Sequence, residues 1–393
     1  MMAKRKFSKF KEKLLALDQY AEDHANPHRN VIRSRSPSFN FAFGNGHGIP
    51  RGYTLLIGGP PKGGKSTKIN DIIGQTQIDY PEGFIIKFDT EFREDLQLSP
   101  AEKKIWGIDD DRYQCYQTND VAEIYDRINN VIPAMIDDGL DVPLIIIDSV
   151  NQIQGLRSAE KTSVKDQRAA FGDLARTLQE CTKSILPTIR RKKIACIFTC
   201  HIGAELDPAE IMRGNKTRPK VADGMKHMCE YYAYIEPILG QRGSKDLLEQ
   251  PLVYNVPAGL EEKKQERSGH RIRVRIKSAT KGPVGRLAEF TYDYRHGIVN
   301  QHEEVFLLAD NLKVFSRSDT NRNVRVFGDL KWNGKQATLK ALEEDQELRA
   351  AVMKELYRRD LAGELVGIGE TTPTVGDADD EDDGTELGAE KTE

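Results

Sequence analysis

A glycine-rich segment that joins an apolar run to a helix-compatible run has the residue types needed to bind phosphate. Four residues separate Gly59 from Gly64, Lys65 and Ser66, and the apolar run 55–57 precedes them. Glycines allow a tight turn whose N–H groups face phosphate oxygens, and a helix N-terminus adds positive charge. The lysine would reach the β- and γ-phosphates of a nucleotide, and the serine hydroxyl would ligate Mg²⁺. The alternative interpretation is a glycine-rich turn without a ligand, but the spacing, the Lys-Ser pair and the flanking runs together favour a phosphate-binding loop.

The same segment contains two prolines, Pro60 and Pro61, at its start. Because proline has no backbone N–H, the donors of a phosphate cradle must come from Lys62 onward. The residues expected to contact the nucleotide are therefore Gly59, Lys62, Gly63, Gly64, Lys65, Ser66 and Thr67.

Three further apolar runs end in polar residues. The run 144–147 ends at Asp148, which would lie beside the Mg²⁺ of a nucleotide. The run 84–88 ends in Asp89-Thr90-Glu91, where Glu91 would polarise the water that attacks the γ-phosphate; the alternative is an acid that caps a turn. The third run ends at His201, either a structural histidine or a side chain that senses the γ-phosphate.

Alternating apolar runs and helical patterns must position these side chains. Strands are expected at 55–57, 84–89, 143–148 and 193–201, with helices at 65–79, 119–138 and 165–190 between them. Short apolar runs separated by helices indicate a parallel sheet that is covered on both faces. Further strands at 231–239, 271–279 and 287–294 would extend this sheet, and helices are expected at 335–345 and 347–360. The predicted fold class is α/β with a mostly parallel central sheet.

The composition favours a protein of the cytoplasm. Of 393 residues, 38% are hydrophobic and 30% are charged, and no run reaches the roughly 18 apolar residues that span a bilayer. Lysines and an arginine near the N-terminus are not followed by the apolar segment of a signal peptide. The five cysteines are odd in number and form no CxxC pair, so reduced thiols are expected rather than disulfides or a zinc site.

The net charge of −3 is unevenly distributed along the chain. Residues 377–393 contain nine acidic residues and one lysine, a net charge of −8 that leaves +5 on residues 1–376. An acidic tail on a mildly basic body is a pattern of nucleic-acid-binding proteins, although an acidic run is also a common feature of solvated, disordered tails.

The ends of the chain differ from its centre in pattern. Residues 7–24 have the apolar spacing of a helix, and the connector 26–38 separates them from the core, so this helix could pack on a neighbouring subunit. The predicted organisation is an N-terminal helix and linker at 1–37, a core at 38–300, a small α/β appendage at 301–366 and a disordered acidic tail at 367–393.

Four motifs resemble the RecA/UvsX family of homologous recombinases, most closely the versions of large bacteriophages. They are SFNFAFGNGHGIPRGYTLLIGGPPKGGKST, IIKFDTEF, PLIIIDSV and IFTCHIG, and the resemblance covers roughly residues 38–300. It implies a RecA-type P-loop ATPase core in which Glu91 activates water and Asp148, with Ser149, supports Mg²⁺. It also implies that His201 couples the γ-phosphate to DNA binding, although bacterial members have glutamine there.

The resemblance further places two DNA-binding loops and a pair of lysines. The loops are roughly 154–167, with Arg157, Lys161 and Lys165, and the segment from His201 to about 223, with Arg213, Lys216, Arg218 and Lys220. Such basic segments attract the phosphates of single-stranded DNA, and the alternative is solvated surface loops. Neither loop has an aromatic residue for stacking, so sequence-neutral backbone contacts are expected. Lys277 and Lys281 approximate the family's lysines that reach the ATP of a neighbouring subunit.

The activity that this resemblance implies is DNA-dependent hydrolysis of ATP with Mg²⁺ in recombination and repair. Subunits would associate head to tail into a helical filament on single-stranded DNA and exchange strands with homologous duplex DNA, with single-strand-binding and loader proteins as partners and no membrane. The alternatives are a ring-forming helicase or motor with the same core, an architectural DNA-filament protein that binds ATP with little hydrolysis, and a small-molecule kinase.

Overall fold

The computed structural model describes nine segments of the chain. They are residues 30–44, 46–94, 99–154, 164–212, 217–221, 223–238, 269–280, 282–318 and 321–365. At 164–175, 210 and 223 the description is limited to the backbone. The predicted helix at 7–24 and the acidic tail lie outside the described residues.

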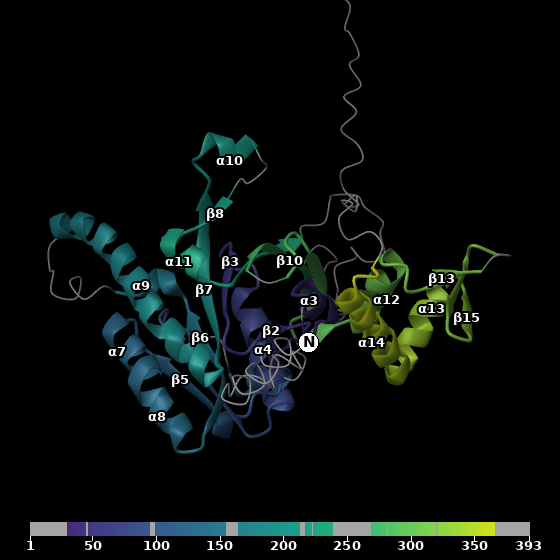
Figure 1. The fold of residues 1–393 in the computed structure, drawn as a ribbon, viewed down its shortest axis with the longest axis horizontal. Helices are drawn as coiled ribbons and strands as arrows, with labels where there is room; N and C mark the ends of the chain where they lie inside the picture. Colours follow the sequence, from purple (N-terminus) through teal and green to yellow (C-terminus); the bar gives the residue numbers. More distant parts are fainter. Residues whose placement is uncertain are drawn as a thin grey trace, which may run out of the picture.

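A large sheet organises the described structure (Figure 1). Its strand order is β12-β11-β10-β9-β3-β7-β6-β4-β5, and the strands from β9 to β5 are mutually parallel. The antiparallel strands β10, β11 and β12 extend the edge beyond β9. The strand bounds are β3 Thr54–Gly59, β4 Gly83–Asp89, β5 Tyr113–Gln117, β6 Asp141–Asp148, β7 Ala195–Ala204, β9 Tyr231–Ile238, β10 Gly269–Ala279, β11 Leu287–Asp293 and β12 Gly297–Val299.

Continuous apolar runs become the central strands of this sheet. All residues of β3 are buried, and β6 is buried from Val142 onward. Strands that are buried on both faces read as unbroken apolar sequence, which is why the pattern located β3, β4, β6 and β7. The edge strand β5 was not predicted, because its sequence YQCYQ has no apolar run.

Helices cover both faces of the sheet. On one face, α3 (Pro37–Ala42), α4 (Lys65–Asp79) and α6 (Pro100–Trp106) contribute to a hydrophobic cluster with Ile57, Ile146 and Ile197 of the sheet. On the other face, α7 (Val121–Asp126), α8 (Ile132–Asp137) and α9 (Val164–Lys192) pack with residues such as Ile145 and Phe198. The helix predicted at 65–79 is observed as α4 with the same bounds.

The single helix predicted at 119–138 is observed in three parts. A π-helical stretch, Arg127–Val131, separates α7 from α8, and Pro133 lies in the first turn of α8. Proline has no N–H to donate to the preceding turn, so the regular hydrogen-bond pattern cannot continue through this position. The prediction located the helical segment correctly and missed the change of pitch inside it.

The predicted connector 26–38 ends in structure that belongs to the core. Ser36 caps α3 by accepting a hydrogen bond from the Phe39 N–H, and Pro37 occupies the first turn. Strand β1 (Val31–Ile32) pairs with β2 (Ile49–Pro50) on either side of this helix. Phe39 and Phe43 lie in the core cluster of the sheet, so this segment is an integral layer of the fold.

Residues 301–365 pack around a hydrophobic cluster of their own. Helices α12 (Gln301–Asn311), α13 (Gly334–Glu344) and α14 (Gln346–Ala362) surround Phe306, Leu342 and Leu356. A small antiparallel sheet joins them, with β13 Ser316–Arg317, β14 Val324–Phe327 and β15 Leu330–Asn333. Phe41 of α3 enters this cluster, so the small unit is packed directly against the core.

A hairpin projects from the sheet where β7 ends (Figure 1). Strand β8 (Thr217–Pro219) pairs antiparallel with the end of β7, helix α10 (Pro208–Met212) lies between them, and α11 (Asp223–Met228) follows. Across the described segments, no helix combines the length and apolar character required to cross a membrane.

Candidate functional site

The ends of four parallel strands bring the predicted site residues to one edge of the sheet. The register places Gly59 of β3 beside His201 of β7, and Asp89 of β4 beside Asp148 of β6. Parallel strands present their carboxyl ends on the same edge, which is where ligands bind in open α/β sheets. Residues that are up to 142 positions apart in sequence, from Gly59 to His201, therefore share one site.

The predicted phosphate-binding loop connects β3 to α4 in a tight turn. Gly64 has a φ of 93°, a conformation that favours glycine, and a Cβ at this position would lie 2.6 Å from the Ile272 side chain of β10. Lys65 Nζ donates to the carbonyl oxygens of Gly59 at 2.9 Å and Pro60 at 2.8 Å. Burial lowers the pKa of Lys65, while the negative charges of Asp148 and Glu91 act in the opposite direction.

Ser66 and Asp148, the two predicted magnesium ligands, lie next to each other. Ser66 Oγ donates to Asp148 Oδ2 at 3.4 Å, and Thr199 Oγ1 donates to Asp148 Oδ1 at 2.5 Å. Hydroxyl and carboxylate oxygens are the ligands that Mg²⁺ prefers, so this pair fits the ion. Thr199 was missed by the sequence interpretation, although it lies two residues before His201 in the same strand.

Glu91 is at the centre of a polar cluster. Its Oε1 accepts a hydrogen bond from Ser149 Oγ at 2.9 Å and lies 3.2 Å from Nε2 of His201. Its Oε2 is 2.9 Å from NH1 of Arg93. The structure thus brings the predicted water-activating carboxylate and the predicted phosphate-sensing histidine into direct contact, which the sequence motifs treated as separate.

His201 is also connected to the projecting hairpin. Its backbone N–H donates to Oδ1 of Asn151 at 2.6 Å, and the side-chain amide of Asn151 donates to the Lys220 carbonyl at 2.5 Å. The Lys220 N–H in turn donates to the His201 carbonyl at 2.7 Å. A continuous set of hydrogen bonds therefore joins the strand ends to a predicted DNA-binding residue.

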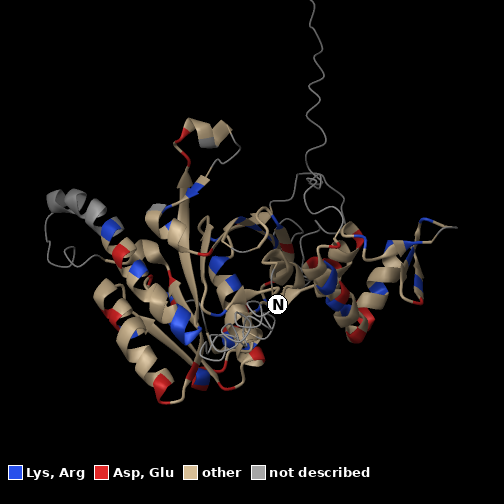
Figure 2. Cartoon of the chain, in the orientation of Figure 1, with Lys and Arg blue, Asp and Glu red and all other residues tan. Residues whose placement is uncertain are grey.

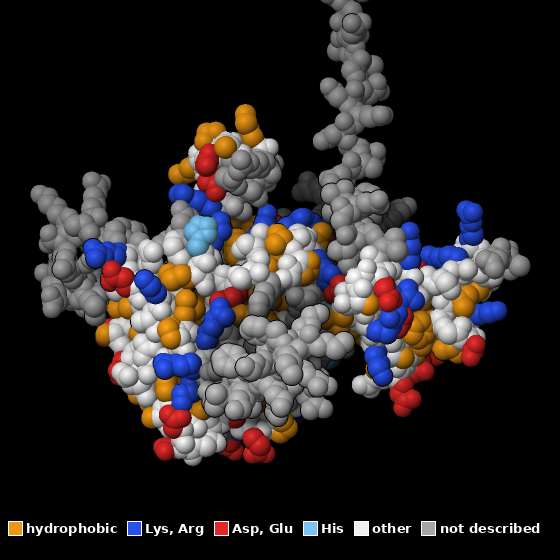
Figure 3. Space-filling model, viewed as in Figure 1, with side chains coloured by type: hydrophobic (Ala, Val, Ile, Leu, Met, Phe, Trp, Pro, Cys, Tyr) orange, Lys and Arg blue, Asp and Glu red, His pale blue; other side chains and the backbone are white. Residues whose placement is uncertain are grey.

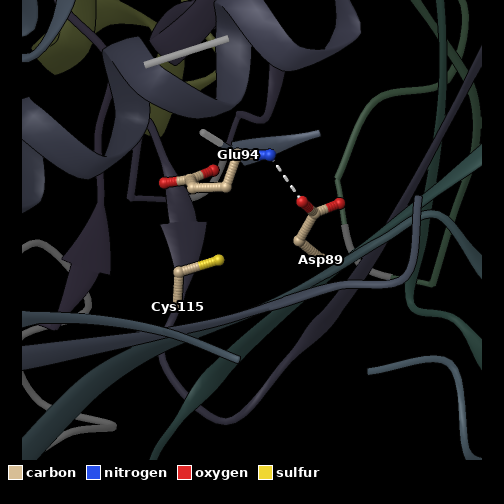
Figure 4. Close-up of side chains that lie close together, drawn as sticks. All are labelled: Asp89, Glu94 and Cys115. Atoms are coloured by element: carbon tan, nitrogen blue, oxygen red, sulfur yellow. Dashed lines mark hydrogen bonds between the residues drawn. The ribbon is translucent and has the colours of Figure 1, made fainter. Parts of the chain in front are cut away.

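A second acidic group includes residues on both sides of Glu91 in the sequence: the side chains of Asp89, Glu94 and Cys115 lie close together (Figure 4). Asp89 accepts hydrogen bonds from the backbone N–H groups of Glu91, Arg93 and Glu94. Glu94 also accepts hydrogen bonds, from Lys87 Nζ at 2.8 Å and from the Tyr113 hydroxyl at 2.6 Å.

The protonation states of this group favour structure over metal binding. Burial raises the pKa of the Cys115 thiol to about 12, so it is a poor ligand. Burial alone would lower the pKa of Lys87, but the neighbouring Asp148 and Glu94 outweigh it and raise the pKa. We interpret the group as the support that fixes the turn that carries Glu91.

An aromatic cluster beside the start of α4 was not predicted. Tyr292 stacks on Trp106 with ring centres 5.7 Å apart, and His270 lies 5.6 Å from Tyr292 and 5.8 Å from Tyr294. Burial raises the pKa of Tyr292, which a hydrogen bond with the Thr67 side chain partly offsets, so this cluster adjoins the loop. No sequence signal pointed to this cluster, because its aromatic residues come from three separate segments of the chain.

The predicted DNA-binding residues are only partly described. Arg218 and Lys220 are exposed on and after β8, and Figure 2 marks the basic residue in this strand. Lys165 lies in α9, where the description is limited to the backbone. Lys277 is exposed on β10, and its Nζ lies 6.0 Å from the centre of the Tyr234 ring. The residues that lie outside the described segments are Arg157, Lys161, Arg213, Lys216 and Lys281.

The tip of the hairpin has an apolar surface. Leu206, Ile211 and Met212 are exposed by 71%, 44% and 88%, and hydrophobic side chains are visible over α10 in Figure 3. The sequence interpretation considered aromatic residues alone for contact with bases and overlooked these aliphatic side chains.

The fold indicates a class of protein. The described structure is a mixed α/β fold with a large, mostly parallel sheet, and this architecture fits a RecA-like core.

Comparison with known proteins agrees with that class. The chain is 26% identical to the RecA protein of Leptospira biflexa over 283 residues, which cover 71% of this chain and 62% of that protein. It is 24% identical to the RecA protein of Aquifex aeolicus over 319 residues, 81% of this chain and 80% of that protein. The chain thus spans less than two thirds of the Leptospira relative. No protein-family model matches the chain. These similarities support a relationship to the RecA family.

Proposed function

We propose that this protein is an ATP-dependent DNA recombinase that forms helical filaments on single-stranded DNA and exchanges strands with homologous duplex DNA. The carrying observation is the convergence of Lys65, Ser66, Asp148, Glu91 and His201 at one sheet edge, joined by hydrogen bonds to the hairpin of Arg218 and Lys220. The distant similarity to RecA proteins supports the same proposal.

The side chains of this site suit hydrolysis of ATP. Lys65 would bind the β- and γ-phosphates, Ser66 and Asp148 would hold Mg²⁺, and Glu91 would accept a proton from the attacking water. Bound Mg²⁺ supplies positive charge that neutralises the phosphate oxygens. The aromatic ring of Tyr294, a residue that is 42% exposed, is suited to stack on the nucleotide base.

DNA would be gripped through the hairpin. Arg218 and Lys220 would neutralise phosphates, and the exposed aliphatic side chains at the tip would lie against bases. Because His201 contacts both Glu91 and the hairpin backbone, the state of the γ-phosphate would shift the population of hairpin conformations that bind DNA. Lys277 and Lys281 would reach the ATP of the neighbouring subunit.

Electron microscopy of the purified protein with ATP and single-stranded DNA tests this proposal, together with ATP turnover with and without DNA. We expect open helical filaments and DNA-stimulated hydrolysis from the unmodified protein, and neither from Lys65→Ala. Closed rings would favour the motor alternative, and filaments without turnover would favour the architectural alternative.

A further inference from the structure

Arg93 combines an anchored backbone with an accessible side chain. Its N–H donates to Asp89 Oδ2 at 2.6 Å, and Asp89 holds two neighbouring N–H groups of the same turn. The Arg93 side chain is 55% exposed, whereas the Glu91 side chain that it contacts is 12% exposed. The turn therefore fixes the backbone of Arg93, while the exposed side chain can move its guanidinium from one partner to another.

Arg93 lies next to residues that are predicted to act on the γ-phosphate. Its NH1 lies 2.9 Å from Glu91 Oε2, and Glu91 is bonded to Ser149, the residue after the predicted magnesium ligand Asp148. The guanidinium also contributes to the lowered pKa of Lys65, although burial is the larger cause. Arg93 and Lys65 are thus two neighbouring cations, one in the turn after β4 and one at the start of α4.

Arg93 is a cation suited to a further phosphate contact at this edge of the sheet. Among the described residues at the strand ends, Lys87 is buried and is paired with Glu94 at 2.8 Å and Asp148 at 3.9 Å. Arg93 has five N–H donors in a fork that matches phosphate oxygens, and NH1 makes its ion pair with Glu91. The γ-phosphate of ATP carries more negative charge than the carboxylate and competes for this fork.

We propose that Arg93 binds the γ-phosphate of ATP within the same subunit, and that its transfer from Glu91 to the phosphate releases the Glu91 carboxylate for catalysis. Water oxygen then bonds to the γ-phosphorus, the bond to the bridging oxygen breaks with its electron pair left on ADP, and Glu91 takes the proton of the water. Arg93 stabilises the charge that develops on the transferred group. This inference rests on the proposed ATPase function.

The test compares affinity for a triphosphate with affinity for a diphosphate. In Arg93→Ala we expect the affinity for ATPγS to fall roughly tenfold to hundredfold, the affinity for ADP to stay within about twofold, and turnover to fall by about 10²-fold or more. Arg93→Lys, which keeps the charge and loses the fork, should have intermediate values. Arg176→Ala is the matched control, since Arg176 is 78% exposed and pairs with Glu180 at 2.9 Å far from these residues in sequence.

The outcomes separate this inference from the proposed function. The role of Arg93 would be overturned, and the proposed function left standing, if Arg93→Ala melts like the unmodified protein and has the same ratio of ATPγS affinity to ADP affinity. Equal weakening of both nucleotides would also overturn it, because a γ-phosphate ligand acts on the triphosphate. If the unmodified protein binds neither nucleotide, the proposed function fails together with this inference.

Discussion

Both carboxylate oxygens of Glu91 have partners in the described structure. Oε1 is shared by Ser149 and His201, and Oε2 faces Arg93. An oxygen that is already in contact with another side chain is not open to the attacking water, so the activity proposed for Glu91 requires that one partner leaves. At the residue scale, the proposed mechanism therefore puts control of hydrolysis in the exchange of partners around this one side chain.

Glu91→Gln should separate nucleotide binding from turnover. The substitution keeps the size of the side chain and its hydrogen bond with Ser149, but it removes the negative charge, so turnover should fall about 10²–10⁴-fold while ATP still binds. Filaments of this variant should persist after free ATP is removed. Turnover and filament lifetime are measured together, with Glu82→Gln, an exposed glutamate just before β4, as the control. Unchanged turnover would remove Glu91 from the mechanism.

At the scale of elements, α4 is held in place by close contact with α6. Gly74 faces the end of α6, and a Cβ at this position would lie 1.8 Å from the Trp106 carbonyl oxygen. That oxygen also accepts a hydrogen bond from Arg35 NH2 at 2.5 Å. Because α4 begins at the predicted phosphate-binding loop, this contact helps to fix the direction from which the loop is presented.

Gly74→Ala should destabilise the protein even though alanine favours helices by roughly 1 kcal/mol over glycine. Relief of the collision requires α4 and α6 to move apart, which typically costs about 1–3 kcal/mol. Denaturant unfolding measures the effect, and Ile78→Ala on the exposed side of the same helix is the control. Stability equal to or above that of the unmodified protein would contradict this prediction and would mean that α4 and α6 move apart at little cost.

The hairpin of β7 and β8 is the second element with a specific expected effect. Replacing Arg218 and Lys220 with glutamate should weaken binding of single-stranded DNA and leave ATP binding unchanged, because both cations lie on the exposed hairpin. If each neutralises one phosphate, the slope of log affinity against log salt should decrease by roughly 1.4. The control exchanges Lys340 and Lys354, exposed lysines of α13 and α14. An unchanged salt titration would contradict the assignment.

At the scale of the whole molecule, buried polar contacts join the small C-terminal unit to the core. Glu304 of α12 accepts hydrogen bonds from Ser36 Oγ at 2.5 Å and Ser38 Oγ at 2.6 Å. Asp360 of α14 pairs with Arg286, and His47 stacks on Tyr357 with ring centres 3.8 Å apart. These contacts hold the C-terminal unit against α3 and the residues that follow it.

Glu304 should make stability depend on pH. Burial raises its pKa from 4.5 to about 7, so the folded protein binds this proton more tightly than the unfolded chain does. The stabilising contribution is fully present below pH 4.5 and is lost as the pH rises to about 7, a change of about 3 kcal/mol. Glu304→Gln cannot titrate, so its unfolding free energy should decrease less between pH 5 and pH 8.

Denaturant unfolding at a series of pH values measures this difference. Glu344→Gln, at an exposed position of α13, should have the same pH dependence as the unmodified protein. Parallel pH profiles for Glu304→Gln and the unmodified protein would show that Glu304 ionises normally in the folded state.

The sequence by itself determined the local units of this protein. The glycine spacing and the apolar run before it located β3, the loop and α4, because a strand, a tight turn and a helix start each depend on neighbouring residues. The strands that end at Asp89, Asp148 and near His201 were located for the same reason. The sequence therefore identified the polar residues at the strand ends as candidates, but it did not show how they are arranged in space.

The tertiary structure alone decided which of these candidates touch. Glu91 and Ser149 are 58 residues apart, and their contact depends on β4 and β6 being neighbours in the sheet. The hydrogen bonds from Ser36 and Ser38 to Glu304 join residues that are 268 and 266 positions apart, and they depend on how the C-terminal unit packs. Local patterns specify strands and helices but not strand order or packing partners, because those follow from burial of the whole set of apolar faces at once.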